Sequence, residues 1–132
     1  MLVTNGTVNE EPLIELLPLI DAMNIDLKGF SQEFYDRVDE NFETVKRTIE
    51  LASRECHVEV TTLVIPGWND APDEMEQMSS WLASVDRSIP YHISRFFPCY
   101  HLTDVAPTPV HTINALVGIA EKHLDYVYRG NC

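Results

Sequence analysis

The chain has 132 residues, of which 45% are hydrophobic and 23% are charged. These fractions are typical of soluble globular chains, so they exclude a disordered or fibrous protein and favour a single folded domain. The 21 Asp and Glu residues outnumber the nine Lys and Arg, which gives a formal net charge of −12. Nucleic-acid binding needs a basic patch, and cations scattered singly along an acidic chain exclude it as an expected function.

Membrane insertion and export are also unsupported. No stretch approaches the ~18 apolar residues of a membrane span, and the first residues show no basic region followed by an apolar run. Cys56, Cys99 and Cys132 lie far apart without a CxxC pair, so neither a disulfide framework nor a zinc ribbon is indicated. We therefore expect a cytoplasmic protein.

Five short apolar or β-branched segments alternate with longer amphipathic ones along the chain. The predicted strands cover residues 2–4, 21–27, 57–65, 91–96 and 125–129. Four helices are predicted between them: a short one over 13–20 that Pro18 interrupts, one with the apolar stripe Phe42, Val45, Ile49 and Ala52, one after Trp68, and one over 109–123. Asp70 and Thr108 are the expected N-caps of the last two, each followed by a proline in the first turn.

This order of elements predicts an α/β fold, a partial TIM-type (βα) barrel with about five parallel strands and four flanking helices. Complete eight-stranded barrels have about 250 residues, so residues 1–132 correspond to roughly half of one. A complete open doubly wound sheet is the alternative. A partial barrel has open strand edges and an exposed lumen face, so self-association is expected.

The second predicted strand carries apolar and polar residues in strict alternation. Met23, Ile25 and Leu27 point to one face, and Asn24, Asp26 and Lys28 to the other. The neighbouring strands repeat the pattern with Glu59 and Thr61, and with His92 and Ser94. Charges on a covered face must pair, contact a ligand or line a wet lumen, so the sequence predicts a polar binding site inside the barrel.

Other chemical motifs are weaker. Cys56-His57 and Cys99-Tyr100-His101 lack the spacing of closed zinc sites, so no metal ligands are predicted. The sequence has no GxSxG, HExxH or P-loop, and catalytic residues are not identified from it. The predicted strand ends are rich in Gly, Asn, Asp, Lys and Arg, which suit a polar zwitterionic small molecule.

Several of these segments together resemble a known family. They are Val3-Thr4-Asn5-Gly6, the stretch from Asp21 to Phe30, Thr62-Leu63-Val64-Ile65-Pro66-Gly67-Trp68-Asn69-Asp70, His92-Ile93-Ser94-Arg95-Phe96-Phe97-Pro98 and Tyr126-Val127-Tyr128-Arg129-Gly130-Asn131. In this order they resemble radical S-adenosylmethionine enzymes related to pyruvate formate-lyase activating enzyme, and within those the AmmeMemoRadiSam-system enzymes. The resemblance covers essentially the whole chain, and it identifies residues 1–132 as the C-terminal part of such a barrel.

In that family a CxxxCxxC loop holds a [4Fe-4S] cluster, which cleaves S-adenosylmethionine to methionine and a 5′-deoxyadenosyl radical. This chain has no CxxxCxxC, and its cysteines are 43 and 33 positions apart, too far to bring three thiolates together in one loop. The resemblance implies S-adenosylmethionine and [4Fe-4S] as cofactors of the parent enzyme. We expect this chain alone to hold neither stably and to be inactive without that segment.

The resemblance also implies cofactor-binding residues. Thr4, Asn5, Asn24, Asp26 and Lys28 would lie near the ribose and the methionine carboxylate. The opposite wall of the lumen would be formed by His92, Ser94 and Arg95. Val3 and Phe97 depart from the family pattern, because acidic and polar residues are common at those two positions.

The reaction implied for the parent enzyme is hydrogen abstraction from a protein glycyl site or another substrate. Two other functions stay open from the residues: a stand-alone α/β module that binds a small molecule, and a subunit that completes the barrel of a split enzyme. An in-frame CxxxCxxC upstream of Met1 would favour truncation, and a separate short reading frame with that motif would favour a split enzyme.

Overall fold

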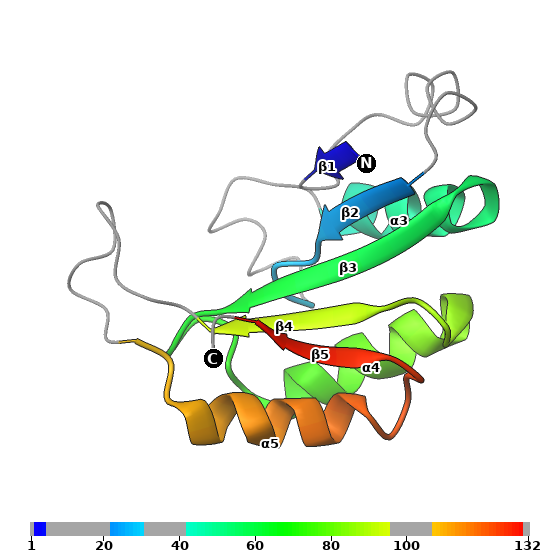
Figure 1. The fold of residues 1–132 in the computed structure, drawn as a ribbon. Helices are drawn as coiled ribbons and strands as arrows, with labels where there is room; N and C mark the ends of the chain where they lie inside the picture. The colour runs from blue at the N-terminus through cyan, green and yellow to red at the C-terminus, as the bar shows by residue number, and fades with distance from the viewer. Residues whose placement is uncertain (1, 5–21, 31–41, 96–106, 131–132) are drawn as a thin grey trace.

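The computed structural model of the protein describes residues 2–4, 22–30, 42–95 and 107–130, and these form a single layered α/β unit (Figure 1). Its strands are β1 (Leu2–Thr4), β2 (Ala22–Asp26), β3 (His57–Val64), β4 (Tyr91–Arg95) and β5 (Val127–Gly130). The helices are α3 (Phe42–Glu55), α4 (Pro72–Asp86) and α5 (Val110–Ala120). None of the helices in these ranges is long and apolar enough to cross a membrane.

All five strands belong to one sheet in the order β1-β2-β3-β4-β5, and every neighbouring pair is parallel. A doubly wound sheet reverses its strand order at a switch point, whereas a βα barrel adds strands sequentially. The sequential order confirms the predicted partial barrel and contradicts the doubly wound alternative. Three of the four predicted helices are present, and the segment 13–20 lies outside the described residues.

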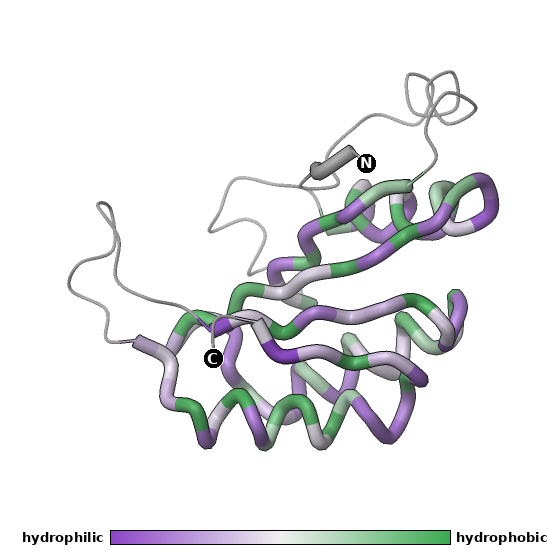
Figure 2. Tube along the Cα trace, in the orientation of Figure 1, coloured by the Kyte–Doolittle hydropathy of each residue, from purple (hydrophilic) through white to green (hydrophobic). Residues whose placement is uncertain are grey.

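The three helices cover one face of the sheet, because the apolar side chains of strands and helices form one cluster. Met23, Ile25 and Leu27 are fully buried in it with Ile49 of α3 and Leu82 of α4. Figure 2 shows the corresponding alternation of hydrophobic and hydrophilic residues along the chain. The core therefore lies between sheet and helices, and the other residues of each strand face away from it.

Two predicted N-caps are wrong. The N-cap of α4 is Ala71, and Asp70 instead accepts a hydrogen bond from the Gly67 N–H at 3.2 Å. The N-cap of α5 is Pro109, and the buried Thr108 hydroxyl donates to the Val64 carbonyl at 2.5 Å. In both cases the side chain that the local sequence assigned to capping the helix forms a hydrogen bond with a different backbone group.

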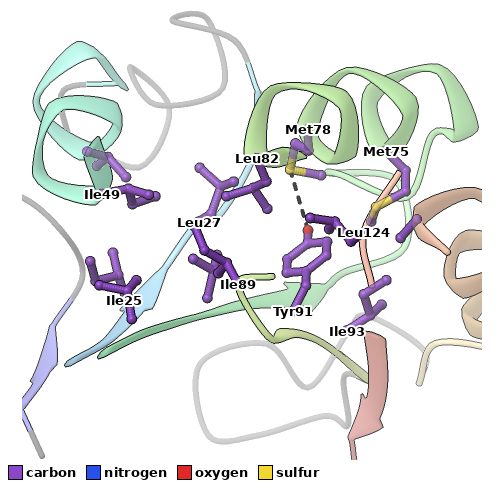
Figure 3. Packing of buried hydrophobic residues seen from close by; sticks show 14 of the residues in the cluster. Ile25, Leu27, Ile49, Met75, Met78, Leu82, Ile89, Tyr91, Ile93 and Leu124 are labelled. Carbon is purple, nitrogen blue, oxygen red and sulfur yellow. Dashed lines mark hydrogen bonds between the residues drawn. The ribbon is translucent and has the colours of Figure 1, made fainter. Parts of the chain in front are cut away.

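A buried chain of hydroxyl groups links β3, β4 and the residue that follows β2 inside the core. Thr62 Oγ1 donates to the Leu27 carbonyl at 2.6 Å, and Tyr91 Oη lies 2.6 Å from Thr62 Oγ1. Because the single Thr62 proton is used on Leu27, the Tyr91 hydroxyl is the donor in the second bond. Figure 3 shows the Tyr91 ring pointing from β4 toward Met78 of α4, whose sulfur lies 3.8 Å from Oη.

Replacing Tyr91 by Phe removes this donor without changing the packed ring. We expect the free energy of unfolding to fall by about 1 kcal/mol, the usual contribution of one hydrogen bond. The half-exposed Tyr126 offers the matched control, and Tyr126→Phe should leave stability unchanged within about 0.5 kcal/mol. Urea unfolding of the two variants measures the difference, and equal midpoints would show that the buried hydroxyl chain contributes nothing.

Candidate functional site

The face of the sheet turned away from the helices carries polar side chains from three neighbouring strands. We call it the polar face and define it by seven partly buried residues: Asn24, Asp26, Lys28, Glu59, Thr61, His92 and Ser94. The strand register pairs Asp26 with Thr61, and Thr61 with His92. Paired residues of parallel strands project from the same face, so the predicted alternation is confirmed and these side chains form a continuous surface.

The amino-terminal part of the predicted site is only partly described. The register pairs Val3 with Asn24 and Thr4 with Ile25. Asn5 lies outside the described residues. Asn24 Oδ1 accepts a hydrogen bond from the Thr61 hydroxyl at 2.9 Å, which ties β2 to β3 across the polar face.

The opposite wall of the predicted site is divided. His92 and Ser94 both project from the polar face, since each alternates with the buried Tyr91 and Ile93. Arg95 alternates with Ser94, and its Nε donates to the Thr108 carbonyl just before α5. The structure therefore places His92 and Ser94 on the same face as Glu59 and Thr61 of β3, while this contact directs the Arg95 Nε toward the segment that leads into α5.

Glu59 lies at the centre of a group of contacts that sequence reasoning did not identify. One carboxylate oxygen is 2.6 Å from His92 Nε2, and the other is 3.2 Å from His57 Nε2. The His92 ring in turn stacks on Tyr128, with the ring centroids 5.2 Å apart. The His57-x-Glu59 spacing could have shown that these two residues share a face, but the partnership with His92 depends on strand register.

The hydrogen bond from His92 is the largest effect and lowers the pKa of the Glu59 carboxyl group. Burial opposes it to a lesser extent, and the weaker bond from His57 again lowers the pKa. A carboxyl group whose pKa is lower in the folded state stabilises the fold above its unfolded pKa and loses that contribution as pH falls through the folded value. The Glu59 contacts should therefore stabilise the protein at neutral pH and cease to do so in acid.

We accordingly expect Glu59→Gln to be less stable than the wild type at pH 7, and the difference to disappear as the pH falls below the ordinary glutamate value of 4.5. Urea unfolding of both proteins between pH 7 and pH 3 measures it. Glu43→Gln, which removes an exposed carboxylate of α3, is the control and should show little dependence. A stability difference that stays constant across this range would contradict the assigned role of the charge.

Asn69 closes the carboxyl-terminal edge of β2 and β3, where ligands bind in parallel α/β folds. It is 2% exposed, and its Nδ2 donates to the carbonyls of Lys28 and Leu63 at 2.7 and 2.9 Å. Its Oδ1 accepts from the Ile65 N–H at 2.7 Å. The turn before it uses Gly67 at φ 80°, a conformation that other residues rarely adopt. This side chain therefore fixes the backbone beside Lys28.

The described residues do not fit an iron–sulfur cluster. They contain no group of three or more His, Cys, Asp and Glu residues that could hold a metal ion. Cys56 directly precedes β3, at the edge of the sheet opposite to Lys28 and Asn69. Burial, with a smaller effect of the Glu55 charge, raises the pKa of its thiol, which disfavours the thiolate that iron requires. The polar face does fit a small zwitterion, since it offers acidic, basic and neutral polar groups.

A sequential parallel sheet with helices on one face and polar side chains on the other defines a barrel-type domain of the α/β class. The family model of the Radical SAM superfamily matches residues 1–82. The chain therefore belongs to the radical S-adenosylmethionine superfamily, whose enzymes use S-adenosylmethionine and an iron–sulfur cluster.

The chain is also similar to individual proteins. The chain is 42% identical to an uncharacterized protein of Methanocaldococcus jannaschii, over 99% of this chain and 40% of that protein. It is 28% identical to pyruvate formate-lyase 1-activating enzyme of Escherichia coli K12, over 91% of this chain and 55% of the enzyme. The chain thus spans about half the length of the curated relatives it matches.

Among solved structures, a domain of pyruvate-formate lyase-activating enzyme from Bacteroides vulgatus has a TM-score of 0.83 at 16% identity. The match covers 98% of this chain and 80% of that domain. At this identity the likeness shows the fold alone, and it confirms the barrel-type α/β architecture.

Proposed function

We propose that residues 1–132 form the C-terminal part of a radical S-adenosylmethionine barrel domain and supply the wall of the lumen that faces the cofactor and the substrate. The observation that carries this proposal is the polar face, on which Asn24, Asp26 and Lys28 project from a parallel strand beside Thr61 and His92. A purely structural half-barrel would not need charged residues on this face.

In the parent enzyme the cluster would supply the electron that cleaves S-adenosylmethionine. The residues of this chain would bind and orient that molecule. Lys28 is suited to the methionine carboxylate, because an ammonium group forms charge-assisted hydrogen bonds with it, and Asp26 and Asn24 are suited to ribose hydroxyls. Thr4, Asn5, Ser94 and Arg95 complete the proposed set. The relation to an activating enzyme of pyruvate formate-lyase favours a protein as the substrate of the parent enzyme.

The chain by itself should not assemble the cluster, because its three cysteines are not arranged in a CxxxCxxC segment. We expect anaerobic reconstitution with iron and sulfide to give no visible cluster absorbance and less than one equivalent of bound iron per four chains. Metal analysis and absorbance spectra measure this outcome. A stoichiometric [4Fe-4S] spectrum from the 132-residue chain would refute the argument from cysteine spacing.

The activity itself is tested by adding a polypeptide that carries the CxxxCxxC half of a radical S-adenosylmethionine enzyme. Production of methionine and 5′-deoxyadenosine with a strong reductant should require both polypeptides. It should be lost with a Cys→Ser change in the added half and reduced at least tenfold by Lys28→Met. Activity that is indifferent to Lys28 would place S-adenosylmethionine elsewhere.

A further inference from the structure

The contact between Glu59 and His92 fixes the position of the imidazole ring and also determines which of its nitrogens carries the proton. An ionised carboxylate only accepts hydrogen bonds, so the Nε2 atom of His92, 2.6 Å away, must carry a proton. The lowered pKa of Glu59 keeps the carboxylate ionised at neutral pH. In a neutral imidazole the second nitrogen, Nδ1, then bears a lone pair and is an acceptor.

The orientation of this imidazole is held from two sides. The bond to Glu59 fixes the Nε2 edge, and Tyr128 stacks on the ring at an interplanar angle of 25°. Strand register pairs His92 directly with Tyr128, so the stacking follows from the backbone and not from chance side-chain positions. His92 nevertheless keeps 32% of its side chain exposed, which leaves the ring accessible to a ligand on the polar face.

The surroundings of His92 on the polar face are rich in acceptors. Thr61, which is paired with His92 on β3, donates its only hydroxyl proton to Asn24 Oδ1. Its oxygen is therefore an acceptor toward any other group. Glu59 and Asp26 add two carboxylates, against the single ammonium group of Lys28. A group that enters beside His92 therefore meets acceptors and an excess of negative charge.

From this geometry we propose that Glu59 is a positioning residue, which holds His92 in the Nε2–H tautomer so that its Nδ1 atom accepts a hydrogen bond from an ammonium or hydroxyl group of a bound ligand. This inference adds a role for Glu59 and His92 to the proposed function, and the identity of the ligand rests on that proposed function. S-adenosylmethionine and a separate substrate could each supply such a donor group. The tautomer itself can be measured without cofactor, cluster or activity.

The test is nitrogen-15 NMR of the histidine side chains in the 132-residue chain, with His92 assigned by comparison with His92→Asn. In the neutral imidazole, the Nε2–H form should exceed the other by more than about tenfold. In Glu59→Gln the ratio should fall to within about threefold, because an amide can both donate and accept. His57→Gln removes the other imidazole from Glu59 and should leave the His92 ratio unchanged.

Three probes then test the ligand: ethanolamine, S-adenosylmethionine and acetate, each added separately. Shifts of His92 Nδ1 with ethanolamine alone support a substrate donor, and shifts with S-adenosylmethionine alone support the cofactor. A dominant Nδ1–H form in the wild type, or an unchanged ratio in a folded Glu59→Gln, overturns the positioning role. If Glu59→Gln does not fold, the wild-type ratio alone decides it. The probes are added both to the chain alone and to the chain together with the CxxxCxxC polypeptide. A response to acetate only, or to no probe in either sample, overturns the ligand assignment, whereas the reconstitution experiments decide the proposed function separately.

Discussion

Replacing Asn69 by Ala should lower the free energy of unfolding by about 3 to 5 kcal/mol, which is the largest effect we expect from a polar residue in this chain. The substitution removes three hydrogen bonds at once and leaves the carbonyls of Lys28 and Leu63 and the N–H of Ile65 without their partner. Each buried group left unsatisfied costs more than an average hydrogen bond contributes.

The isosteric change Asn69→Asp separates hydrogen bonding from packing. The carboxylate can still accept from the Ile65 N–H, but it turns an acceptor toward two carbonyls that need a donor. We expect a loss of at least about 2 kcal/mol near neutral pH. Asn114 is the control, since it is exposed and Asn114→Ala should change stability by less than about 0.5 kcal/mol. Equilibrium urea unfolding provides the numbers, and a fully stable Asn69→Asp would contradict the assigned bonds.

Asn69 also holds the backbone next to Lys28, which is a residue of the polar face. Asn69 holds the Lys28 carbonyl, and Glu74 of α4 accepts a hydrogen bond from the Phe30 N–H at 2.8 Å. These two contacts fix the backbone on either side of Gly29, immediately after β2. The segment 66–70 therefore holds the backbone of Lys28 in place through Asn69. It contributes no side chain to the polar face as defined above.

The fold was largely predictable because its signals are local. Strict alternation over residues 23–28 assigned both faces of β2, and the stripe that includes Phe42 and Ile49 placed α3, since each pattern depends only on the period of its own element. The wrong N-cap at Thr108 fails for the opposite reason. Thr108 bonds to Val64, 44 positions earlier, and no local rule reports such a partner.

The site was predictable by residue type but not by contact. Alternation placed Glu59 and His92 on polar strand faces, yet their pairing requires β4 to lie against β3 in one particular register. A shift of one residue would turn His92 to the buried face. Arg95 shows the same limit, because the contact of its Nε with the Thr108 carbonyl depends on the tertiary fold and not on its place in the strand.

Gly130 should be intolerant of a side chain, because β5 approaches Ser94 very closely. A Cβ atom at Gly130 would lie 2.4 Å from Ser94 Oγ, 3.2 Å from its Cβ and 3.4 Å from its Cα. The hydroxyl can rotate away, but the Cβ and the backbone cannot. We expect Gly130→Ala to lower the free energy of unfolding by about 1 to 3 kcal/mol, as is usual for overpacking. Gly118→Ala is the matched control: nothing lies within 4 Å, and alanine should stabilise α5 by about 0.5 to 1 kcal/mol.

A double-mutant cycle with Ser94 identifies the cause of the loss. Ser94→Ala removes only the hydroxyl contact, so Gly130→Ala should keep part of its cost in that background. Ser94→Gly removes the Cβ contact as well, and the remaining cost should be under about 0.5 kcal/mol. An equal cost in all three backgrounds would mean that Gly130 is required for its backbone and not for space. A rescue by Ser94→Gly would instead show that the Ser94 side chain fills the place on the polar face that a residue at 130 would otherwise occupy.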